Sequence, residues 1–390
     1  MADEYPRFEF SKKEVKRVGR VIAANEPLTP ESEERIREAF RIANSWRDAH
    51  AYPMDSVRRS VIMHLARAGL GGDTVARLKR MPAISGKLRR INLGLDQLQD
   101  LAGCRCIMPD LESVGRLISV LRARLKHPIQ REDDYIAQPK DDGYRSHHLI
   151  ISFKHEREAS AYDGRKVELQ VRTRLQHAWA TTVEAVGLFQ NENLKNHEGS
   201  QEWLRLFVLA SAGMAEAEGC ALHPEWPKGD ALRSELKGLA RRLDALGVLE
   251  RVRLGVQGTT DPLVLGYRPS HYLIRFDLAT KTVRVEPHNR IKSATLSYDQ
   301  AEEQANLSNV EGENVVLVKV DTLESLKSAY PNYFGDVAVF EDFLRKIVKG
   351  RETSEFTHLP VARRPPEREP VGDLSWLRRS PFAKPGSGRK

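Results

Sequence analysis

The segment KVELQVRT (166–173) carries an unusual amount of potential chemistry for its length. Its polar and apolar residues alternate strictly, so a β-strand would place Glu168, Gln170 and Arg172 on one face and the apolar residues on the other. The carboxylate of Glu168 could hold a divalent cation or accept a proton. A sheet surface exposed to solvent would show the same alternation, so this strand alone does not distinguish a site from a plain surface.

Two further segments favour a site. In SHHLIISF (146–153), His148 lies on the strand face opposite to Leu149 and Ile151, and it would lie near Glu168 if the two strands pair. In DLAGCR, Asp100 comes just before a third short strand, on which Arg105 points away from the cysteines beside it. Two carboxylates on a basic surface with aromatic residues at its edge are what a Mg²⁺–nucleotide site requires.

A basic segment precedes these strands. RLKRMPAISGKLRRI (77–91) has six basic residues and no acidic one. Such a run is often one solvated face of a helix. Pro82 and Gly86 interrupt helical spacing, so we predict a loop, and a cationic loop suits a triphosphate.

The elements that must position these residues follow from periodicity. Helical spacing dominates the first 95 or so residues, where Ser11 and Glu14 form a capping-box pattern. Beyond them the patterns predict strands at 103–108, 146–153 and 166–173, helices at 112–126, 174–188, 199–219 and 228–247, a hairpin at 271–286, and a strand then a helix within 314–334. The fold class is therefore α+β, a mixed β-sheet flanked by helices, with a second small α+β domain.

Composition narrows the class of protein. A chain of 390 residues with 40% hydrophobic and 30% charged residues is ordinary for a globular protein of two domains plus appendages. No segment approaches the roughly 18 apolar residues of a membrane span, and MADEYPRFEF lacks the apolar core of a signal peptide. Three cysteines are too few for a disulfide framework, which favours the cytoplasm. The net charge of +8 permits a polyanionic partner.

Several familiar chemistries are excluded by their missing motifs. The sequence has no phosphate-binding P-loop pattern, no H-E-x-x-H zinc pattern and no histidine followed by aspartate. Cys104 and Cys106 are predicted to be small core residues. His177 and Trp179 are predicted to pack around the site rather than to bind ligands.

Four segments in order resemble the RelA/SpoT synthetase family. They are RLK…K (77–87), DLAGCR (100–105), DYIAQPKDDGYRSHH (134–148) and VELQVRT (167–173). The family pattern is R-x-K, D-x-x-G-x-R, Y-x-x-x-P-K-x-x-G-Y-x-S-x-H and E-x-Q-x-R-T. The resemblance covers roughly residues 40–190 and implies a nucleotidyltransferase-like sheet that transfers pyrophosphate from ATP to a ribose 3′-hydroxyl.

The resemblance also implies roles for individual residues. Asp100 and Glu168 would be catalytic and hold Mg²⁺, with Glu168 also activating the acceptor hydroxyl. ATP would be bound by Arg77, Lys79, Lys87 and Arg105. The acceptor would be bound by Lys140, Tyr144, His148, Gln170 and Arg172, with the ring of Tyr144 stacking on its base. Gly143 would permit the turn before Tyr144.

Two positions depart from the family pattern. Ala83 stands where the ATP segment usually has serine, which removes one phosphate contact. His147 replaces a residue that is usually apolar, and the sequence offers no functional account of it.

The C-terminal part carries a second resemblance. VVLVKVDTLESLKSAYPNYFGD (315–336) resembles the antitoxin domain of fused toxin–antitoxin synthetases of the CapRel type, a pseudo-zinc-finger. The absence of cysteine after Cys220 agrees. In that family a Y-x-x-Y motif keeps the enzyme inactive until a phage structural protein, the capsid protein, binds; Tyr330 and Tyr333 have this spacing. The alternative is that both tyrosines pack inside the small domain.

These resemblances lead to one expected function and two alternatives. The expected function is an autoinhibited toxin of phage defence that transfers pyrophosphate from ATP to the 3′ end of tRNA and blocks translation. The alternatives are a (p)ppGpp synthetase that modifies GDP or GTP under a regulatory domain, and a non-catalytic RNA-binding or phage-sensing module. Basic residues proposed for tRNA binding are Arg89, Arg90, Arg116 and Arg122.

The expected domain boundaries follow the same changes of pattern. They are N-terminal helices with the ATP segment (1–95), the synthetase core (96–195), a helical connector (196–258), the antitoxin or sensor domain (259–350) and a proline-rich, basic, disordered tail (351–390).

Overall fold

A mixed β-sheet carries the predicted site residues in the computed structural model. The structure describes residues 5, 7–24, 26, 29–155, 160–190, 194, 199–255, 257–259, 271–277, 282–307, 313–319 and 337–350. By their contacts, residues 1–357 form one unit, and all the described elements lie in it. In chain order these elements are α1 (Lys12–Ala24), α2 (Glu33–Asp48), α3 (Ala51–Arg67), β1 (Asp73–Leu78), α4 (Met81–Arg90), the short 3₁₀ helix η2 (Leu95–Gln97), β2 (Ala102–Met108), α5 (Leu111–Arg124), β3 (Ile129–Asp134), β4 (His147–Ser152), β5 (Lys166–Thr173), α6 (Arg174–Gln190), α7 (Gln201–Glu218), α8 (Gly229–Arg242), α9 (Ala245–Gly255), β6 (Gln257–Thr259), β7 (His271–Asp277), β8 (Thr282–His288), α10 (Ile291–Leu307), β9 (Glu313–Lys319) and α12 (Ala338–Val348).

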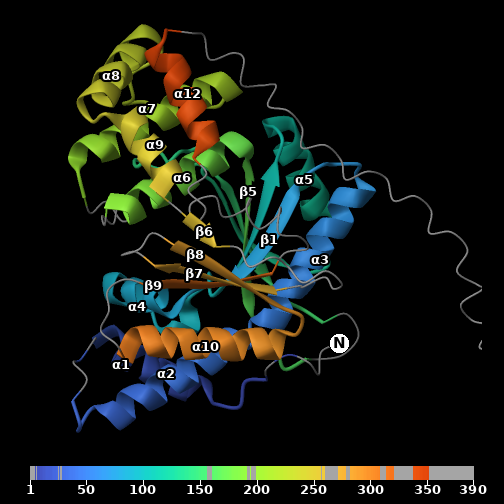
Figure 1. Cartoon of the computed structure of the whole chain (residues 1–390). Coiled ribbons are helices and arrows are strands. Elements are labelled where there is room, and N and C mark those ends of the chain that lie inside the picture. The colour runs from blue at the N-terminus through green and yellow to red at the C-terminus, as the bar shows by residue number, and fades with distance from the viewer. Residues whose placement is uncertain are drawn as a thin grey trace, which may run out of the picture. The chain divides into compact units, whose positions relative to one another are not determined.

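The strands form one nine-stranded sheet in the order β3-β4-β5-β2-β1-β9-β7-β8-β6. β2 and β5 run parallel, as do β6 and β8, and the other neighbouring pairs are antiparallel. Figure 1 shows this sheet with helices around it. The predicted α+β class, with a mixed sheet flanked by helices, is confirmed.

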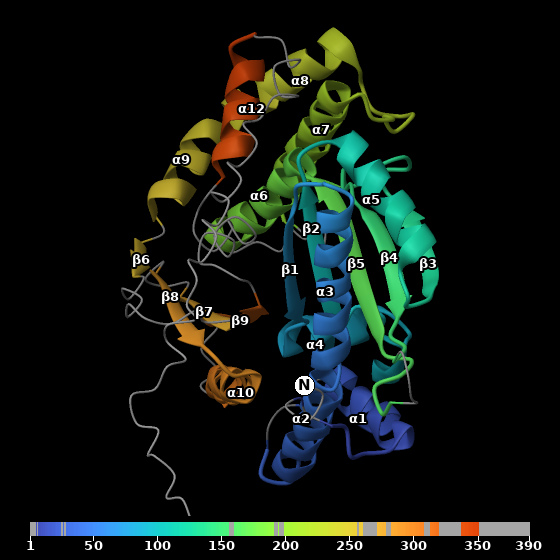
Figure 2. The same cartoon turned by 90° about the vertical axis from the view of Figure 1, so that its right-hand side faces the viewer.

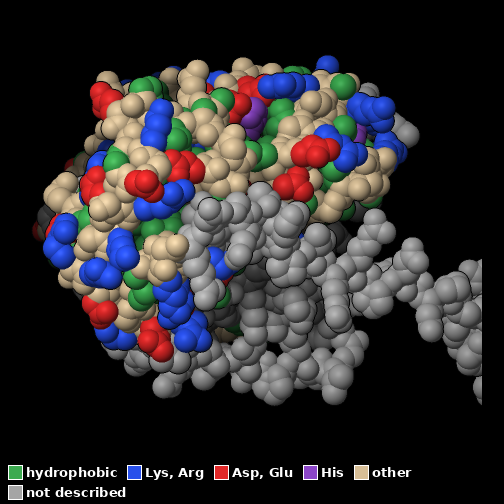
Figure 3. Space-filling model, turned by 90° about the horizontal axis from the view of Figure 1, so that it is seen from above, with side chains coloured by type: hydrophobic (Ala, Val, Ile, Leu, Met, Phe, Trp, Pro, Cys, Tyr) green, Lys and Arg blue, Asp and Glu red, His purple; other side chains and the backbone are tan. Residues whose placement is uncertain are grey.

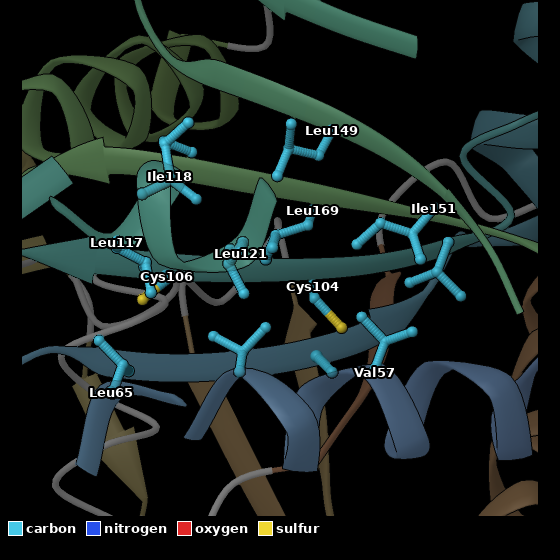
Figure 4. Packing of buried hydrophobic residues seen from close by; sticks show 14 of the residues in the cluster. Val57, Leu65, Cys104, Cys106, Leu117, Ile118, Leu121, Leu149, Ile151 and Leu169 are labelled. Atoms are coloured by element: carbon cyan, nitrogen blue, oxygen red, sulfur yellow. The ribbon is translucent and has the colours of Figure 1, made fainter. Parts of the chain in front are cut away.

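The main apolar core lies between the central strands and two helices, α3 and α5. The apolar face of β5 contributes Val167, Leu169 and Val171, all fully buried. Cys104 and Cys106 of β2 lie in the same cluster, as predicted, and Figure 4 shows them facing side chains of α3 and α5. Burying one such aliphatic side chain contributes about 1.5–3 kcal/mol. In Figure 2 the two helices cover this face of the sheet.

A second core joins α1, α2 and α4. Met81, Ile84 and Leu88 of α4 pack against apolar side chains of the two N-terminal helices. The predicted capping box at the start of α1 is present: the backbone N–H of Ser11 donates to Glu14 Oε2 at 2.7 Å, and that of Glu14 donates to Ser11 Oγ at 3.3 Å. This core packs α4 against the N-terminal helices.

The prediction of a cationic loop over 77–91 is wrong. The segment forms the end of β1, a two-residue link and the helix α4. Pro82 is tolerated because it occupies the first turn, where its missing N–H has no helical partner. The apolar stripe of α4 outweighs the cost of Gly86, which is about 1 kcal/mol.

The predicted helix over 228–247 is two helices, α8 and α9. Asp244, between them, has φ of +46°, a left-handed conformation that ends the first helix. α12 packs against α6, α8 and α9, so these helices lie together, as Figure 1 shows.

Among the described residues, no helix is both long enough and apolar enough to cross a membrane.

The C-terminal strands extend the sheet. The predicted hairpin at 271–286 is present as the antiparallel pair β7–β8. β9 joins this hairpin to the core strands by pairing with β1 at Ala76 and Arg77. The helix predicted after β9 falls at 320–334, outside the described residues.

Candidate active site

Three adjacent strands bring the predicted site residues together. On β5, Glu168, Gln170 and Arg172 face away from the apolar core, as the alternation predicted. His148 of β4 lies beside Gln170 in the register, and Arg105 of β2 lies beside it on the other side. β4 therefore pairs with β5, which is the condition for His148 to lie near Glu168.

The polar face of these strands forms the floor of a cavity of about 710 Å³. All eleven residues predicted to act in catalysis, ATP binding or acceptor binding line it: Arg77, Lys79, Lys87, Asp100, Arg105, Lys140, Tyr144, His148, Glu168, Gln170 and Arg172. Segments from residue 77 to residue 172 thus converge on one space. The individual roles stay predictions.

Asp100 is held by two lysines. Its Oδ2 accepts hydrogen bonds from Lys79 Nζ at 3.0 Å and from Lys87 Nζ at 2.7 Å. Burial raises the pKa of Asp100, but the two ammonium groups more than offset it and hold the pKa below its usual value. The aspartate is therefore ionised at neutral pH, and any anion that bound to these lysines would have to compete with it.

The site's donor atoms fit a magnesium ion. Asp100 Oδ1 is buried and has no hydrogen-bond partner among the described residues, so one carboxylate oxygen remains for a cation. No group of three or more His, Cys, Asp or Glu in the described part of the chain could hold a metal by itself. Mg²⁺ is commonly bound by one or two carboxylates, with water and phosphate oxygens completing its shell. Asp100 and Glu168 would supply those two carboxylates.

Glu168 is positioned by its strand neighbours. Its Oε1 lies 3.2 Å from His148 Nδ1, and Gln170 Nε2 donates to Oε2 at 2.8 Å. Burial raises the pKa of Glu168, whereas the contacts with His148 and Gln170 lower it, and the net shift is downward. The nearby charge of Asp100 acts in the opposite sense, so the two carboxylates are close enough to influence each other.

An aromatic corner lies beside Glu168. The Tyr144 hydroxyl and His148 Nε2 are 2.9 Å apart, and the ring of Tyr135 is edge-on to His148 at 5.1 Å. Lys140 Nζ lies 4.4 Å from the centre of the Tyr135 ring and 5.3 Å from that of Tyr144. An aromatic face next to a lysine suits a base attached to a phosphate.

Sequence reasoning missed several residues of the cavity. Tyr135 is one of them, and the signal that marks it is its place as the first residue of the Y-x-x-x-P-K pattern. Arg131 of β3 and Arg205 of α7 also line the cavity, and no sequence motif marks either of them. Trp179 lines it too, but its Nε1 donates to the backbone oxygen of Phe207 at 2.7 Å, which fits its predicted packing role.

Gly143 makes the turn before Tyr144. Its φ is +92°, in the left-handed region, and a Cβ there would lie 3.0 Å from the side chains of Ser211 and Trp179. We expect Gly143→Ala to lower the free energy of unfolding by at least the ~1–3 kcal/mol of a strained backbone. Gly164, with φ of +80° and open space around it, is the matched control. Urea unfolding gives the loss in the free energy of unfolding for each alanine variant. The extra loss at Gly143 measures the cost of the close approach to Trp179 and Ser211, and equal losses would show that this approach has no effect.

The four arginines proposed for tRNA lie on two different surfaces. Arg89 and Arg90 are exposed at the end of α4, the helix that also carries Lys87. Arg116 and Arg122 lie on α5, whose apolar side packs on the face of the sheet opposite the cavity. The structure therefore does not bring these four residues together.

His147 has a structural role in the fold. It is buried on the α5 side of β4, where its Nε2 contacts Glu132 Oε1 and its Nδ1 lies 3.5 Å from Asp134 Oδ1. Arg122 of α5 is ion-paired with the same Glu132. This group ties α5 to the edge of the sheet.

Tyr330 and Tyr333, predicted to mediate autoinhibition, lie outside the described residues.

Comparisons with known proteins agree with this location. The family described as "Region found in RelA / SpoT proteins" matches residues 76–193. GTP pyrophosphokinase of Escherichia coli K12 is 26% identical over 155 residues, which is 38% of this chain and 20% of that protein. GTP pyrophosphokinase YjbM of Bacillus subtilis is 30% identical over 124 residues, which is 30% of this chain and 57% of that protein.

A solved structure is also similar. Small alarmone synthetase 1 from Bacillus subtilis, bound to its product pppGpp, has a TM-score of 0.38 and 20% identity and covers 44% of this chain and 89% of that one. The chain spans a fifth of the Escherichia coli relative and little more than half of the Bacillus subtilis one. Residues 76–193, which hold all eleven predicted cavity residues, therefore contain a region of the RelA/SpoT type.

Proposed function

We propose that this chain is an ATP-dependent pyrophosphokinase. The observation that carries the proposal is the convergence of two carboxylates, Asp100 and Glu168, with a ring of lysines and arginines in one cavity of about 710 Å³. Pyrophosphate transfer needs little covalent participation from the protein. It needs charge neutralisation and in-line placement of donor and acceptor, which this arrangement can provide.

The residues divide the reaction between them. Arg77, Lys79 and Lys87 bind the triphosphate, and Arg105 supports them. The acceptor 3′-oxygen bonds to the β-phosphorus of ATP, the bond from that phosphorus to the α,β-bridging oxygen breaks, and AMP leaves. The carboxylate of Glu168 takes the proton of the hydroxyl. Mg²⁺, held by Asp100 and Glu168, would neutralise phosphate charge.

A guanosine nucleotide is the first candidate acceptor. Both relatives named above are GTP pyrophosphokinases, which supports GDP or GTP as acceptor and (p)ppGpp as product. The aromatic corner of Tyr135 and Tyr144 offers a stacking surface, and Lys140 lies over both rings to receive a phosphate. This side of the cavity would therefore hold the acceptor.

The 3′ end of tRNA is the second candidate acceptor. It is favoured by α4, which places Lys87 in the cavity and continues to Arg89 and Arg90 on the exposed surface. A phosphodiester backbone that leaves the cavity along this helix would meet those cations. Modification of tRNA would stop its aminoacylation and so block translation.

The C-terminal segment is proposed to inhibit the enzyme in cis, as an antitoxin. Support comes from β9, whose Val318 lies beside Arg77 in the register of β1. A segment hydrogen-bonded to the strand that carries an ATP-binding residue can influence that residue. Its resemblance to the pseudo-zinc-finger of CapRel-type proteins supports a role as phage sensor, with a phage capsid protein as the trigger.

One labelling experiment tests the reaction and the inhibition together. The purified chain and the variant Tyr330→Ala/Tyr333→Ala are incubated with γ-labelled ATP, Mg²⁺ and either GDP/GTP or bulk tRNA. We expect label on one acceptor, and at least about tenfold more in the variant, which corresponds to a docked state favoured by about 1.4 kcal/mol.

The outcomes separate the hypotheses. Label on guanosine nucleotides makes the chain a (p)ppGpp synthetase, and label on tRNA makes it a tRNA-modifying toxin. No label on either acceptor, with or without the tyrosines, supports a non-catalytic RNA-binding or phage-sensing module. Equal labelling by the chain and the variant contradicts inhibition through these tyrosines.

A further inference from the structure

A groove separate from the cavity lies between α3 and α5, on the opposite face of the sheet. Its volume is about 750 Å³. The charged and titratable residues that line it are His64, Arg67, Glu112, Arg116 and Arg124. Three guanidinium groups thus face one carboxylate in a groove that has no part in the proposed reaction.

His64 is the buried group of this groove. Only 3% of it is exposed, and its Nδ1 has no hydrogen-bond partner among the described residues. A buried polar atom without a partner is costly, so a ligand would gain affinity if the imidazole turned to bring this nitrogen into the groove. Burial and the charges of Arg67 and Arg124 lower the pKa of His64, so both arginines lie close to the imidazole.

The arginines are spread along the groove. Arg67 lies at the end of α3, and Arg116 of α5 donates to the backbone oxygen of Ala68 at 3.4 Å. Arg124 is the last residue of α5, eight residues after Arg116, and therefore about 12 Å farther along the helix axis. A ligand with several phosphates can contact both arginines at this spacing.

We propose that this groove binds phosphate groups of a ligand that carries more than one. Guanidinium groups match phosphate oxygens in a bidentate geometry. No phenylalanine, tyrosine or tryptophan is among the described residues that line the groove, so it lacks the stacking surface of the aromatic corner in the cavity. The recognised chemistry is therefore the phosphate chain, from an RNA backbone or from a free polyphosphate, rather than a base.

Local structure, not overall charge, points to this groove. On the face shown in Figure 3, lysine and arginine side chains are interspersed with aspartate and glutamate over the described surface. On α5 itself, Arg122 is ion-paired with Glu132, whereas Arg116 and Arg124 line the groove. The inference does not rest on the proposed reaction, because it concerns binding alone and involves no cavity residue.

The test measures binding in the absence of ATP and Mg²⁺, with EDTA present. The probes are bulk tRNA and inorganic tripolyphosphate, titrated into the full chain at several salt concentrations. We expect Arg124→Glu to weaken binding of at least one probe about tenfold and, for tRNA, to reduce the salt slope by about 1. Arg241→Glu is the matched control, because Arg241 is likewise an exposed arginine in the last turn of a helix, α8.

His64→Leu provides an independent variant. It removes the unpaired polar atom, so the thermal midpoint should stay equal or rise while probe affinity falls about threefold or more. A purely structural His64 would leave affinity unchanged. If only tRNA binding is weakened, the ligand is an RNA backbone. If only tripolyphosphate binding is weakened, the ligand is a small phosphate compound. If binding of both is weakened, the groove is a general phosphate site. If neither probe responds to Arg124→Glu more than to Arg241→Glu, the proposal is overturned.

Discussion

Glu168→Gln is expected to reduce pyrophosphate transfer by about 10³-fold. Glutamine keeps the shape of the side chain and its hydrogen bond with Gln170 or His148, but it loses the negative charge that we propose holds a cation and accepts a proton. The pKa of Glu168 is below its usual value, so the wild-type group is ionised throughout the neutral range. The loss should therefore appear in kcat across that range rather than at one pH.

The control for this variant lies in the same cavity. Glu184 of α6 also lines it, and Glu184→Gln makes the same chemical change away from the strands. We expect Glu184→Gln to keep at least about a fifth of wild-type activity, since a single neutralised charge near the wall costs under about 1 kcal/mol. Equal losses in the two variants would show that the cavity's total charge, and not Glu168 itself, matters.

Asp100→Asn separates the two carboxylates. It should reduce transfer as strongly as Glu168→Gln, because it removes the negative charge of the carboxylate proposed to bind Mg²⁺, whose Oδ1 has no hydrogen-bond partner among the described residues. Unlike Glu168→Gln, it also releases Lys79 and Lys87 from their ion pairs. ATP binding without Mg²⁺, measured by calorimetry, should then be as tight as in the wild type or tighter. Weaker metal-free binding would mean that the lysines need Asp100 to hold them in place.

The strands of the site could be predicted because one face of each packs into the apolar core. Strict alternation in 166–173 placed Glu168 on the polar side, and the same rule placed His148 beside it once β4 and β5 pair. A shift of one residue would move Leu169 and its neighbours out of the core, so the hydrophobic pattern strongly determines the register.

The remaining parts depended on contacts distant in sequence. Pro82 and Gly86 predict a loop over 77–91, yet packing against α1 and α2 makes residues 81–90 of it a helix. Arg131 lines the cavity from β3, a strand with no clear alternation of polar and apolar residues. Arg205 lines it from α7, a helix whose other residues are mostly buried. The pairing of β9 with β1 joins residues more than 200 positions apart, which no local pattern encodes.

The second large effect is expected at Arg47, where the N-terminal helices meet the C-terminal segment. Arg47 of α2 is 1% exposed. Its Nη2 lies 2.9 Å from Asp48 Oδ1 and 2.9 Å from Asp299 Oδ1 of α10, and its guanidinium lies 4.6 Å from the centre of the Tyr298 ring. We expect Arg47→Met to lower the free energy of unfolding by about 3–5 kcal/mol, because it leaves Asp48 buried without its cation.

A double variant tests this reason. Burial raises the pKa of Asp48, and the charge of Arg47 opposes that shift. Adding Asp48→Asn to Arg47→Met removes the unpaired charge and should restore part of the lost stability in urea unfolding. No recovery would mean that the cost lies in lost packing around the guanidinium instead.

Asp299→Asn then separates stability from regulation. It weakens the ion pair between α2 and α10 without leaving a buried charge, because the Asp299 side chain is 33% exposed and Arg47 keeps Asp48. Stability should fall by only about 1 kcal/mol. If docking of the C-terminal segment holds the enzyme inactive, pyrophosphate transfer should rise. Asp230→Asn, which weakens the exposed pair with Arg233 on α8, should change neither quantity. A stable Asp299→Asn variant with unchanged transfer would place the inhibitory contact elsewhere in the C-terminal segment.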